Sequence, residues 1–129
     1  MNTILIVDDN RDDVDITEIA IDEAGFEVKI QAAFSGDDAL KYLQDVESMP
    51  TLILLDLKMP GLSGIETLEK IRGDSRFNKI PVVVVTASLL PSDEEYAYAA
   101  GANGYLNKAL DLKQFSKDIK THLDRWVPK

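Results

Sequence analysis

The sequence has no cysteine, which excludes disulfide bonds and thiol chemistry. It has no apolar run long enough to cross a membrane, and no basic segment of the kind that opens a signal peptide. Basic residues are few: 14 Lys and Arg against 23 Asp and Glu give a formal net charge of -9. Non-specific nucleic-acid binding needs a basic surface. We therefore expect a cytoplasmic protein with neither nucleic acid nor membrane among its partners.

What is present fits one globular domain. The 129 residues are 45% hydrophobic and 29% charged, which is enough to bury a core. Solid runs of Val, Ile and Leu are typical of strands that are covered on both faces, as in a parallel sheet flanked by helices. Short apolar runs predict strands at Thr3–Val7, Val28–Phe34, Leu52–Leu55, Val82–Thr86 and Gly104–Leu106.

Segments with helix signals lie between these runs. Ser63 and Glu66 form a capping-box pattern, and Ser92 with Glu95 repeats it one helix later. The predicted helical segments are Arg11–Gly25, Ser35–Val46, Ser63–Gly73, Ser92–Gly101 and Asp111–Trp126. Strand and helix thus alternate five times, and this alternation predicts a doubly wound α/β domain over residues 1–129.

Polar residues stand at the carboxyl ends of these predicted strands, where ligands bind in such folds. Asp8 and Asp9 follow the first strand, Asp56 follows the third, Thr86 ends the fourth, and Lys108 follows the fifth. Each has an ordinary explanation by itself: acids favour a helix start, Asp initiates turns, and lysines are usually solvated. Those explanations do not account for all five falling at the same end of the sheet.

This combination of residue types favours phosphoryl chemistry. Clustered carboxylates repel one another unless a hard divalent cation such as Mg²⁺ or Mn²⁺ offsets their charge. A carboxylate can also act as a nucleophile and form an aspartyl phosphate. A lysine and a hydroxyl would then hold the phosphoryl oxygens. The residues therefore indicate a site that makes an acyl phosphate on one aspartate.

The chain resembles a response-regulator receiver domain of the CheY type over essentially its whole length. The motifs that carry the resemblance are "ILIVDDN", "LILLDLKMPGLSGIE", "VVVVTAS" and "AGANGYLNKA". The resemblance implies a flavodoxin-like (βα)5 fold with a five-stranded parallel sheet in the order 2-1-3-4-5. We expect no output domain within residues 1–129, and either a standalone receiver or a domain of a longer chain; Met1, close before the first strand, favours a natural start.

The resemblance also assigns the phosphoacceptor and the metal ligands. It implies that Asp56 takes the phosphoryl group. Asp9 would bind Mg²⁺ or Mn²⁺ directly, together with Asp56, and Asp8 would assist through water. The backbone carbonyl of Lys58 would complete the protein's share of the metal shell.

Further residues receive roles from the same resemblance. Thr86 and Lys108 would bind the phosphoryl group, and Thr86 with Tyr105 would form the switch. Lys58 and Ser88, two residues past Asp56 and Thr86, would line the path of the attacking water. Neither of these two is a carboxylate or an amide. We therefore expect slow autodephosphorylation, with Lys58 paired to a phosphoryl oxygen.

The expected partners follow from that family. A sensor histidine kinase or a histidine phosphotransfer protein would donate the phosphoryl group, and the domain would catalyse only its own phosphorylation and dephosphorylation. The signal would leave through the surface of the fourth helix, fifth strand and fifth helix, which carries Tyr96, Tyr98 and Tyr105. That surface would bind a downstream protein or a second copy of the chain.

One position departs from the family pattern. The family has a proline after the lysine with a cis bond before it, whereas this chain has Ala109 after Lys108. A cis bond before Ala costs about 3–4 kcal/mol, against about 0.5–1 kcal/mol before proline. We expect either a trans bond with a rearranged loop or a strained cis bond.

Three alternative functions compete with this interpretation. A pseudo-receiver, which binds a partner without phosphorylation, is left open by Ala109 but disfavoured by the intact set Asp9, Asp56, Thr86 and Lys108. A haloacid-dehalogenase-type phosphohydrolase needs a second acid two residues past the nucleophile, where this chain has Lys58. A flavodoxin needs a phosphate loop after the first strand, where "DDNRDD" would repel a phosphate.

Overall fold

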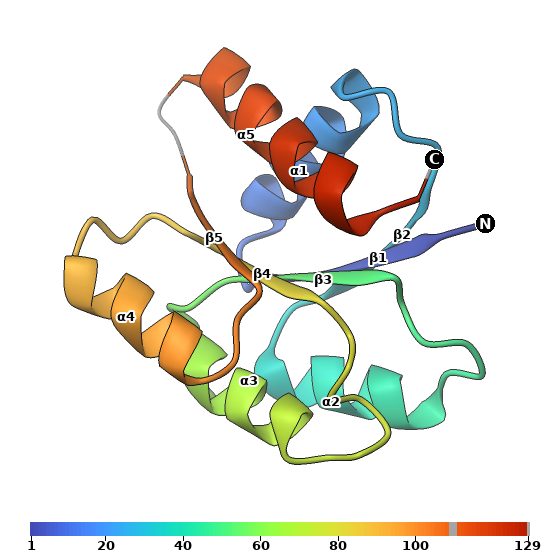
Figure 1. The fold of residues 1–129 in the computed structure, drawn as a ribbon, viewed down its shortest axis with the longest axis vertical. Helices are drawn as coiled ribbons and strands as arrows, with labels where there is room; N and C mark the ends of the chain where they lie inside the picture. Colours follow the sequence, from blue (N-terminus) through green and yellow to red (C-terminus); the bar gives the residue numbers. More distant parts are fainter. Residues whose placement is uncertain (109–110, 129) are drawn as a thin grey trace.

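The computed structural model describes residues 1–108 and 111–128 and has a central parallel sheet with helices on both faces (Figure 1). The strands pair in the order β2-β1-β3-β4-β5. They are β1 (Thr3–Val7), β2 (Lys29–Ala33), β3 (Leu52–Leu55), β4 (Val82–Thr86) and β5 (Gly104–Asn107). The helices are α1 (Arg11–Glu23), α2 (Gly36–Asp45), α3 (Gly64–Arg72), α4 (Pro91–Ala99) and α5 (Leu112–Trp126). The predicted flavodoxin-like fold and its strand order are confirmed.

The helices divide between the two faces: α1 and α5 cover one, and α2, α3 and α4 cover the other (Figure 1). Strands β1, β3 and β4 are buried along nearly their whole length, because both faces are covered. Ile4, Ile6 and Phe115 lie in the core beneath α1 and α5, whereas Leu5 and Leu68 lie in the core on the other side. Alternate residues of β1 thus face opposite cores.

Most helix starts follow the predicted capping residues. Ser63 and Glu66 form the complete capping box of α3. Asp111 accepts a hydrogen bond from the Lys113 N–H at the start of α5. The prediction for α4 was wrong, because its N-cap is Leu90, which makes no side-chain capping bond, and Pro91 occupies the first turn. Proline suits that position because its missing N–H would have had no partner there.

Packing differs strongly between the last two helices. Helix α5 buries Phe115, Ile119 and Leu123 as one apolar stripe. Helix α4 buries only Ala97.

Among the residues that the structure describes, no helix is long and apolar enough to span a bilayer.

Candidate functional site

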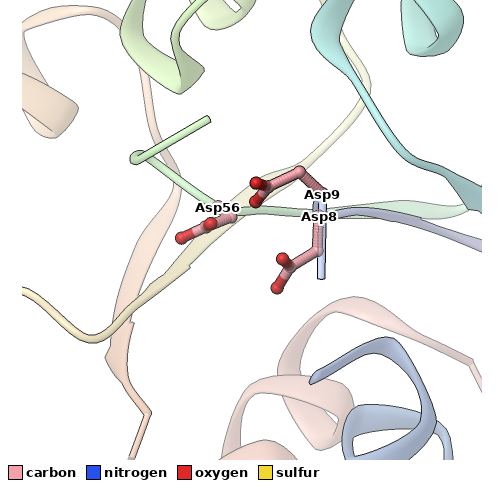
Figure 2. A group of neighbouring side chains, drawn as sticks. All are labelled: Asp8, Asp9 and Asp56. Carbon is pink, nitrogen blue, oxygen red and sulfur yellow. The ribbon is translucent and has the colours of Figure 1, made fainter. Parts of the chain in front are cut away.

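Three carboxylates meet where β1 and β3 end. Val7 and Leu55 are partners in the parallel ladder, and the Asp56 N–H donates to the Val7 carbonyl at 2.9 Å. Asp8 and Asp56 therefore leave their strands side by side. Carboxylate oxygens of Asp8, Asp9 and Asp56 all lie within 4.8 Å of one another (Figure 2). This is also where the strand order reverses, since β1 lies between β2 and β3.

Burial distinguishes these carboxylates. Asp8 and Asp56 are 4% and 6% exposed, whereas Asp9 is exposed. Burial raises the pKa of Asp56 to about 6, with a smaller upward contribution from Asp8, while the ammonium of Lys108 opposes the shift. With this pKa, Asp56 is mostly ionised at neutral pH. It is then able to act as a nucleophile.

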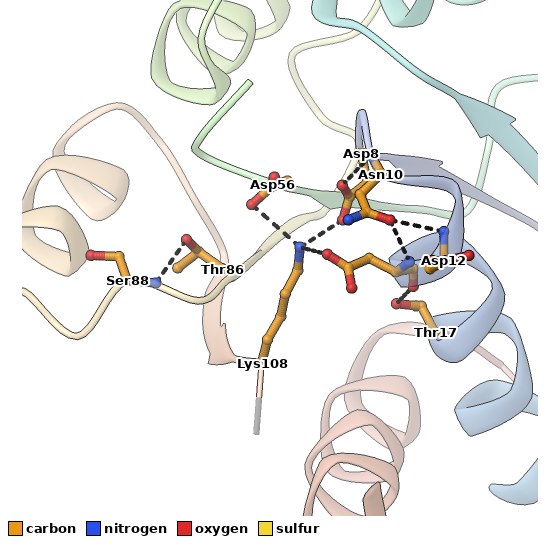
Figure 3. A network of polar contacts seen from close by, with 9 residues as sticks. Asp8, Asn10, Asp12, Thr17, Asp56, Thr86, Ser88 and Lys108 are labelled. Carbon is orange, nitrogen blue, oxygen red and sulfur yellow. Dashed lines mark hydrogen bonds and ion pairs between the residues drawn. The ribbon is translucent and has the colours of Figure 1, made fainter. Parts of the chain in front are cut away.

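Lys108 reaches into the cluster from the end of β5. Its Nζ lies 2.7 Å from Asp8 Oδ2, 2.9 Å from Asp13 Oδ2 and 3.7 Å from Asp56 Oδ1. Figure 3 shows the ammonium between Asp8 and Asp56. Burial disfavours the charge, but hydrogen bonds to Asp8 and Asp13 prevail and raise the pKa of Lys108. The lysine therefore stays charged and holds the ends of β1, β3 and β5 together.

Sequence reasoning missed the part played by Asp13. An acid at the start of a helix has an ordinary explanation, and nothing in the sequence pairs this one with Lys108. The helix begins at Arg11, only two residues past Asp9, because the Asn10 side chain accepts hydrogen bonds from the Asp12 and Asp13 N–H groups at 2.9 and 3.3 Å. The Asn10 N–H in turn donates to Asp8 Oδ1 at 3.0 Å. The early start brings Asp13 to Lys108, which is 95 residues away in the sequence.

A glycine fixes the helix that follows Asp56. A Cβ on Gly64 would lie 2.2 Å from the Asp56 carbonyl oxygen and 2.6 Å from the Leu57 Cα, both of which are rigid backbone. The Gly64 N–H donates to the Leu57 carbonyl at 3.0 Å. Only glycine allows α3 to start this close to the end of β3.

Thr86 and Ser88 lie beside the cluster without a bond to it among the described contacts. Thr86 is fully buried at the end of β4, and its Oγ1 accepts a hydrogen bond from the Ser88 N–H at 3.2 Å (Figure 3). The Ser88 carbonyl accepts a bond from Asn107 Nδ2 at 3.1 Å. Asn107 was not a candidate from the sequence, because a strand-end amide carries no distinctive pattern.

Tyr105 stands opposite Val84 on the neighbouring strand, two residues before Thr86. Its ring is half-buried and packs against the small apolar group of Leu57, Val84 and Ala97 beneath α4. Burial raises the pKa of the Tyr105 phenol, and nearby carboxylates add to the rise. The expected switch residue is thus adjacent to the expected phosphoryl site through β4.

Lys58 turns toward α4. Its Nζ lies 3.5 Å from Asp93 Oδ2, and its side chain is 66% exposed. Asp93 was another residue that sequence reasoning missed, because acids near a helix start are common and nothing in the sequence pairs this one with Lys58. The conformation expected for the Lys108–Ala109 bond involves Ala109, which lies outside the described residues.

This arrangement supports two kinds of chemistry. Three oxygen-bearing side chains at one point are the ligands that hard divalent cations prefer. A buried carboxylate beside a fixed ammonium offers both a nucleophile and a partner for a developing oxyanion. Three carboxylates, Asp8, Asp13 and Asp56, lie around the ammonium of Lys108, and Asp9 adds a fourth carboxylate beside Asp8 and Asp56. The site therefore carries an excess of negative charge that a metal cation would reduce.

Comparison with known proteins agrees with this geometry. The model of the response regulator receiver domain family matches residues 4–120. The probable methanogenesis regulatory protein FilR2 of Methanothrix harundinacea (strain 6Ac) is 37% identical over 130 residues, which cover 95% of this chain and 84% of that protein. The phosphorylated cyanobacterial phytochrome response regulator RcpA superposes with a TM-score of 0.89 at 30% identity, over 98% of this chain and 94% of that one. The Mn²⁺-bound form of response regulator Rcp1 gives 0.87 at 28% identity, over 100% and 96%.

Proposed function

The chain belongs to the response regulator receiver family, and from that membership we propose that it accepts a phosphoryl group on Asp56. The donor is the phosphohistidine of a sensor histidine kinase or of a histidine phosphotransfer protein. The observation that carries the proposal is the Asp56 carboxylate: it is 6% exposed, lies 3.7 Å from the ammonium of Lys108, and stands in a cluster with Asp8 and Asp9.

The transfer needs one nucleophile and no base. A carboxylate oxygen of Asp56 forms a bond to phosphorus, while the bond between phosphorus and the donor nitrogen breaks and its electron pair stays on the imidazole. Asp56 is already ionised near neutral pH, because its pKa is about 6. The product is an acyl phosphate with two negative charges on its remaining oxygens.

Lys108 and Thr86 are the proposed partners of those oxygens. The ammonium of Lys108 already lies near Asp56, and its bonds to Asp8 and Asp13 fix its position. The Thr86 hydroxyl at the end of β4 would donate to a phosphoryl oxygen after a small movement. Such preorganised donors stabilise charge that develops during transfer.

The donor set fits a divalent cation, Mg²⁺ or Mn²⁺. Asp8, Asp9 and Asp56 present carboxylate oxygens within 4.8 Å of one another, and the carbonyl of Lys58 is a further candidate ligand. When bound, the cation would supply positive charge that offsets these carboxylates and the incoming phosphoryl group. The Mn²⁺-bound form of Rcp1, a structural relative at 28% identity, supports this assignment.

The signal leaves through α4, β5 and α5. Movement of Thr86 toward the phosphoryl group would change the packing around Tyr105, which shares the β4–β5 ladder with it. Tyr96 and Tyr98 on α4 are 62% and 47% exposed and could take part in binding. The partner is a downstream protein or a second copy of the chain.

The test is incubation with Mg²⁺ and acetyl phosphate, followed by intact mass measurement. We expect one added phosphate on the unchanged chain and none on Asp56→Asn, which keeps the shape of the side chain and removes the nucleophile. An adduct of equal extent on Asp56→Asn would contradict the assignment. No adduct on the unchanged chain would favour the pseudo-receiver, a binding module without phosphorylation.

A further inference from the structure

Asp93, in the first turn of α4, contacts both loops that border the proposed phosphoryl site. Its Oδ2 accepts a hydrogen bond from the Ser88 hydroxyl and lies 3.5 Å from Lys58 Nζ. Lys58 follows Asp56 by two residues, and Ser88 follows Thr86 by two. One carboxylate on α4 therefore contacts side chains from both of the loops that follow Asp56 and Thr86.

The Ser88 contact also orders the loop that leads into α4. The Leu90 N–H donates to Ser88 Oγ at 3.2 Å, and the Ser88 N–H donates to Thr86 Oγ1 at 3.2 Å. Leu89, between these bonds, is 84% exposed and adds little packing. The hydrogen bond from Ser88, with help from the charge of Lys58, lowers the pKa of Asp93, so its carboxylate stays ionised.

Helix α4 depends on such polar contacts more than its neighbours do. It buries only Ala97, and no side chain caps its N-terminus. A helix with so little apolar packing has a low free energy of local opening. A carboxylate in its first turn also interacts favourably with the helix dipole. Loss of the contacts of Asp93 should therefore shift the position of α4 and lower its local stability.

We propose that Asp93 is a positioning residue that keeps Lys58 away from the phosphoryl group and ties α4 to the unphosphorylated site. The inference rests on the proposed role of Asp56. A phosphoryl group adds about -1.5 to -2 charges beside Lys58. It competes with Asp93 for the same ammonium. When Lys58 turns to the phosphoryl oxygens, α4 loses one of its ties to the site.

The same competition sets the lifetime of the acyl phosphate. In hydrolysis, a water oxygen bonds to phosphorus, the bond from phosphorus to the Asp56 oxygen breaks, and its electron pair returns to the carboxylate. Both water protons leave with the inorganic phosphate. Lys58 at a phosphoryl oxygen covers part of the path of that water. By drawing Lys58 away, Asp93 shortens the lifetime.

The first measurement is the decay of the Asp56 adduct in four variants. Asp93→Asn should slow decay about two- to fivefold, the range expected for loss of an exposed ion pair. Glu95→Gln is the matched control, because it removes the same charge from α4 two residues further on and has no contact with Lys58 or Ser88 among the described residues. In a Lys58→Met background, Asp93→Asn should leave the decay rate unchanged. An equal effect of Asp93→Asn with and without Lys58, or an effect matched by Glu95→Gln, would overturn the proposal.

The second measurement needs no phosphate and separates the two proposals. Amide hydrogen exchange of the unphosphorylated protein should accelerate at Leu90 and in the first turn of α4 in Asp93→Asn, and not in Glu95→Gln. If the unchanged chain took no phosphate, the proposed function would be wrong. Amide hydrogen exchange would still show whether Asp93 holds α4 in place. If hydrogen exchange were unchanged in Asp93→Asn, Asp93 would not hold α4 to the site, even if the chain is phosphorylated on Asp56.

Discussion

Two cations with different surroundings lie at opposite ends of the sheet. At the carboxyl end, Lys108 faces the carboxylates of Asp8, Asp13 and Asp56. At the amino end of β4 and β5, Arg72 donates only to neutral oxygens among its described contacts, at 2.7 to 3.3 Å. These are the carbonyls of Asn78, Ile80 and Gly101 and the side-chain oxygen of Asn103.

Arg72 and Lys108 differ in how well their surroundings balance the charge and the hydrogen bonds of the cation. Each of the three side-chain nitrogens of Arg72 has at least one acceptor. Asn103 Oδ1 also accepts from the Val82 N–H at 2.9 Å, which links the starts of β4 and β5. Lys108 is outnumbered by carboxylates, and Asp56 is the most distant of its three partners. A partly buried cation alone therefore does not mark a functional site. An uncompensated excess of the opposite charge around it does.

Replacing Lys108 should give the largest effect. Lys108→Met keeps much of the stem and removes the charge, and phosphorylation by acetyl phosphate should slow about 100-fold, as for loss of one preorganised donor. The variant should also be less stable, since Asp8 and Asp56 stay buried without their partner. Added Mg²⁺ should restore most of this stability, because the missing element is positive charge. An unchanged phosphorylation rate, measured by intact mass over time, would contradict the role of Lys108.

Arg72→Met is the counterpart at the other end. It should lower the free energy of unfolding by about 2–4 kcal/mol, because the carbonyls of Ile80 and Gly101 lose their donor. Mg²⁺ should not repair this loss, and phosphorylation of the folded protein should proceed at its usual rate. Urea unfolding with and without Mg²⁺ measures the first effect. Repair by Mg²⁺ would show that the two ends of the sheet are not independent.

The sequence predicted the fold better than either of these contact groups. Strands β1, β3 and β4 begin and end at the predicted residues, because solid Val, Ile and Leu runs between turn residues have few alternatives. The start of α4 was misassigned, since Ser92 carries a capping pattern but Pro91 already lies in the helix. Local patterns could not decide between these two starts.

The carboxylate cluster was predictable for a related reason. Parallel strands bring their carboxyl ends to one edge, so Asp8, Asp9 and Asp56 had to meet once the topology was known. The partners from helices were not predictable. Asp13 and Asp93 each reach across to a loop, and the pairing depends on where a helix begins to within one residue. Arg72 was missed because its partners are mostly backbone carbonyls, which any sequence supplies.

A divalent cation should stabilise the carboxyl end of the sheet and leave the contacts of Arg72 at the amino end unaffected. This effect on stability should be smaller than those of the two substitutions above. At ten times its dissociation constant, Mg²⁺ should raise the free energy of unfolding by about 1.4 kcal/mol, because the unfolded chain has no such cluster. Asp9→Asn should shift this response to higher Mg²⁺ concentration, and Arg72→Met should show the same increment as the unchanged chain. Thermal unfolding over a Mg²⁺ series measures both. An identical series for Asp9→Asn would exclude Asp9 as a ligand.

The smallest expected effect concerns pH and the amino end of β5. His122 of α5 lies against the backbone there: a Cβ on Gly104 would be 3.0 Å from His122 Nδ1. Burial lowers the pKa of His122 below its usual 6.5, with Arg125 acting in the same direction and Asp118 against it. The neutral form of the His122 ring is thus favoured in the folded state. The groups that accept hydrogen bonds from Arg72 at this end of the sheet are also neutral.

The sign of the pH dependence follows from this lowered pKa. As pH falls below 6.5, the unfolded chain protonates His122 before the folded chain does, so stability decreases with falling pH until the folded pKa is passed. Asp56 acts oppositely in an overlapping range, because its folded pKa of about 6 exceeds the ordinary 3.8 and its contribution falls as pH rises. The difference in unfolding free energy between the unchanged chain and His122→Gln cancels the contribution of Asp56, which both chains share. That difference should grow in favour of His122→Gln as pH falls below 6.5, and a flat difference curve would show that His122 titrates alike in both states.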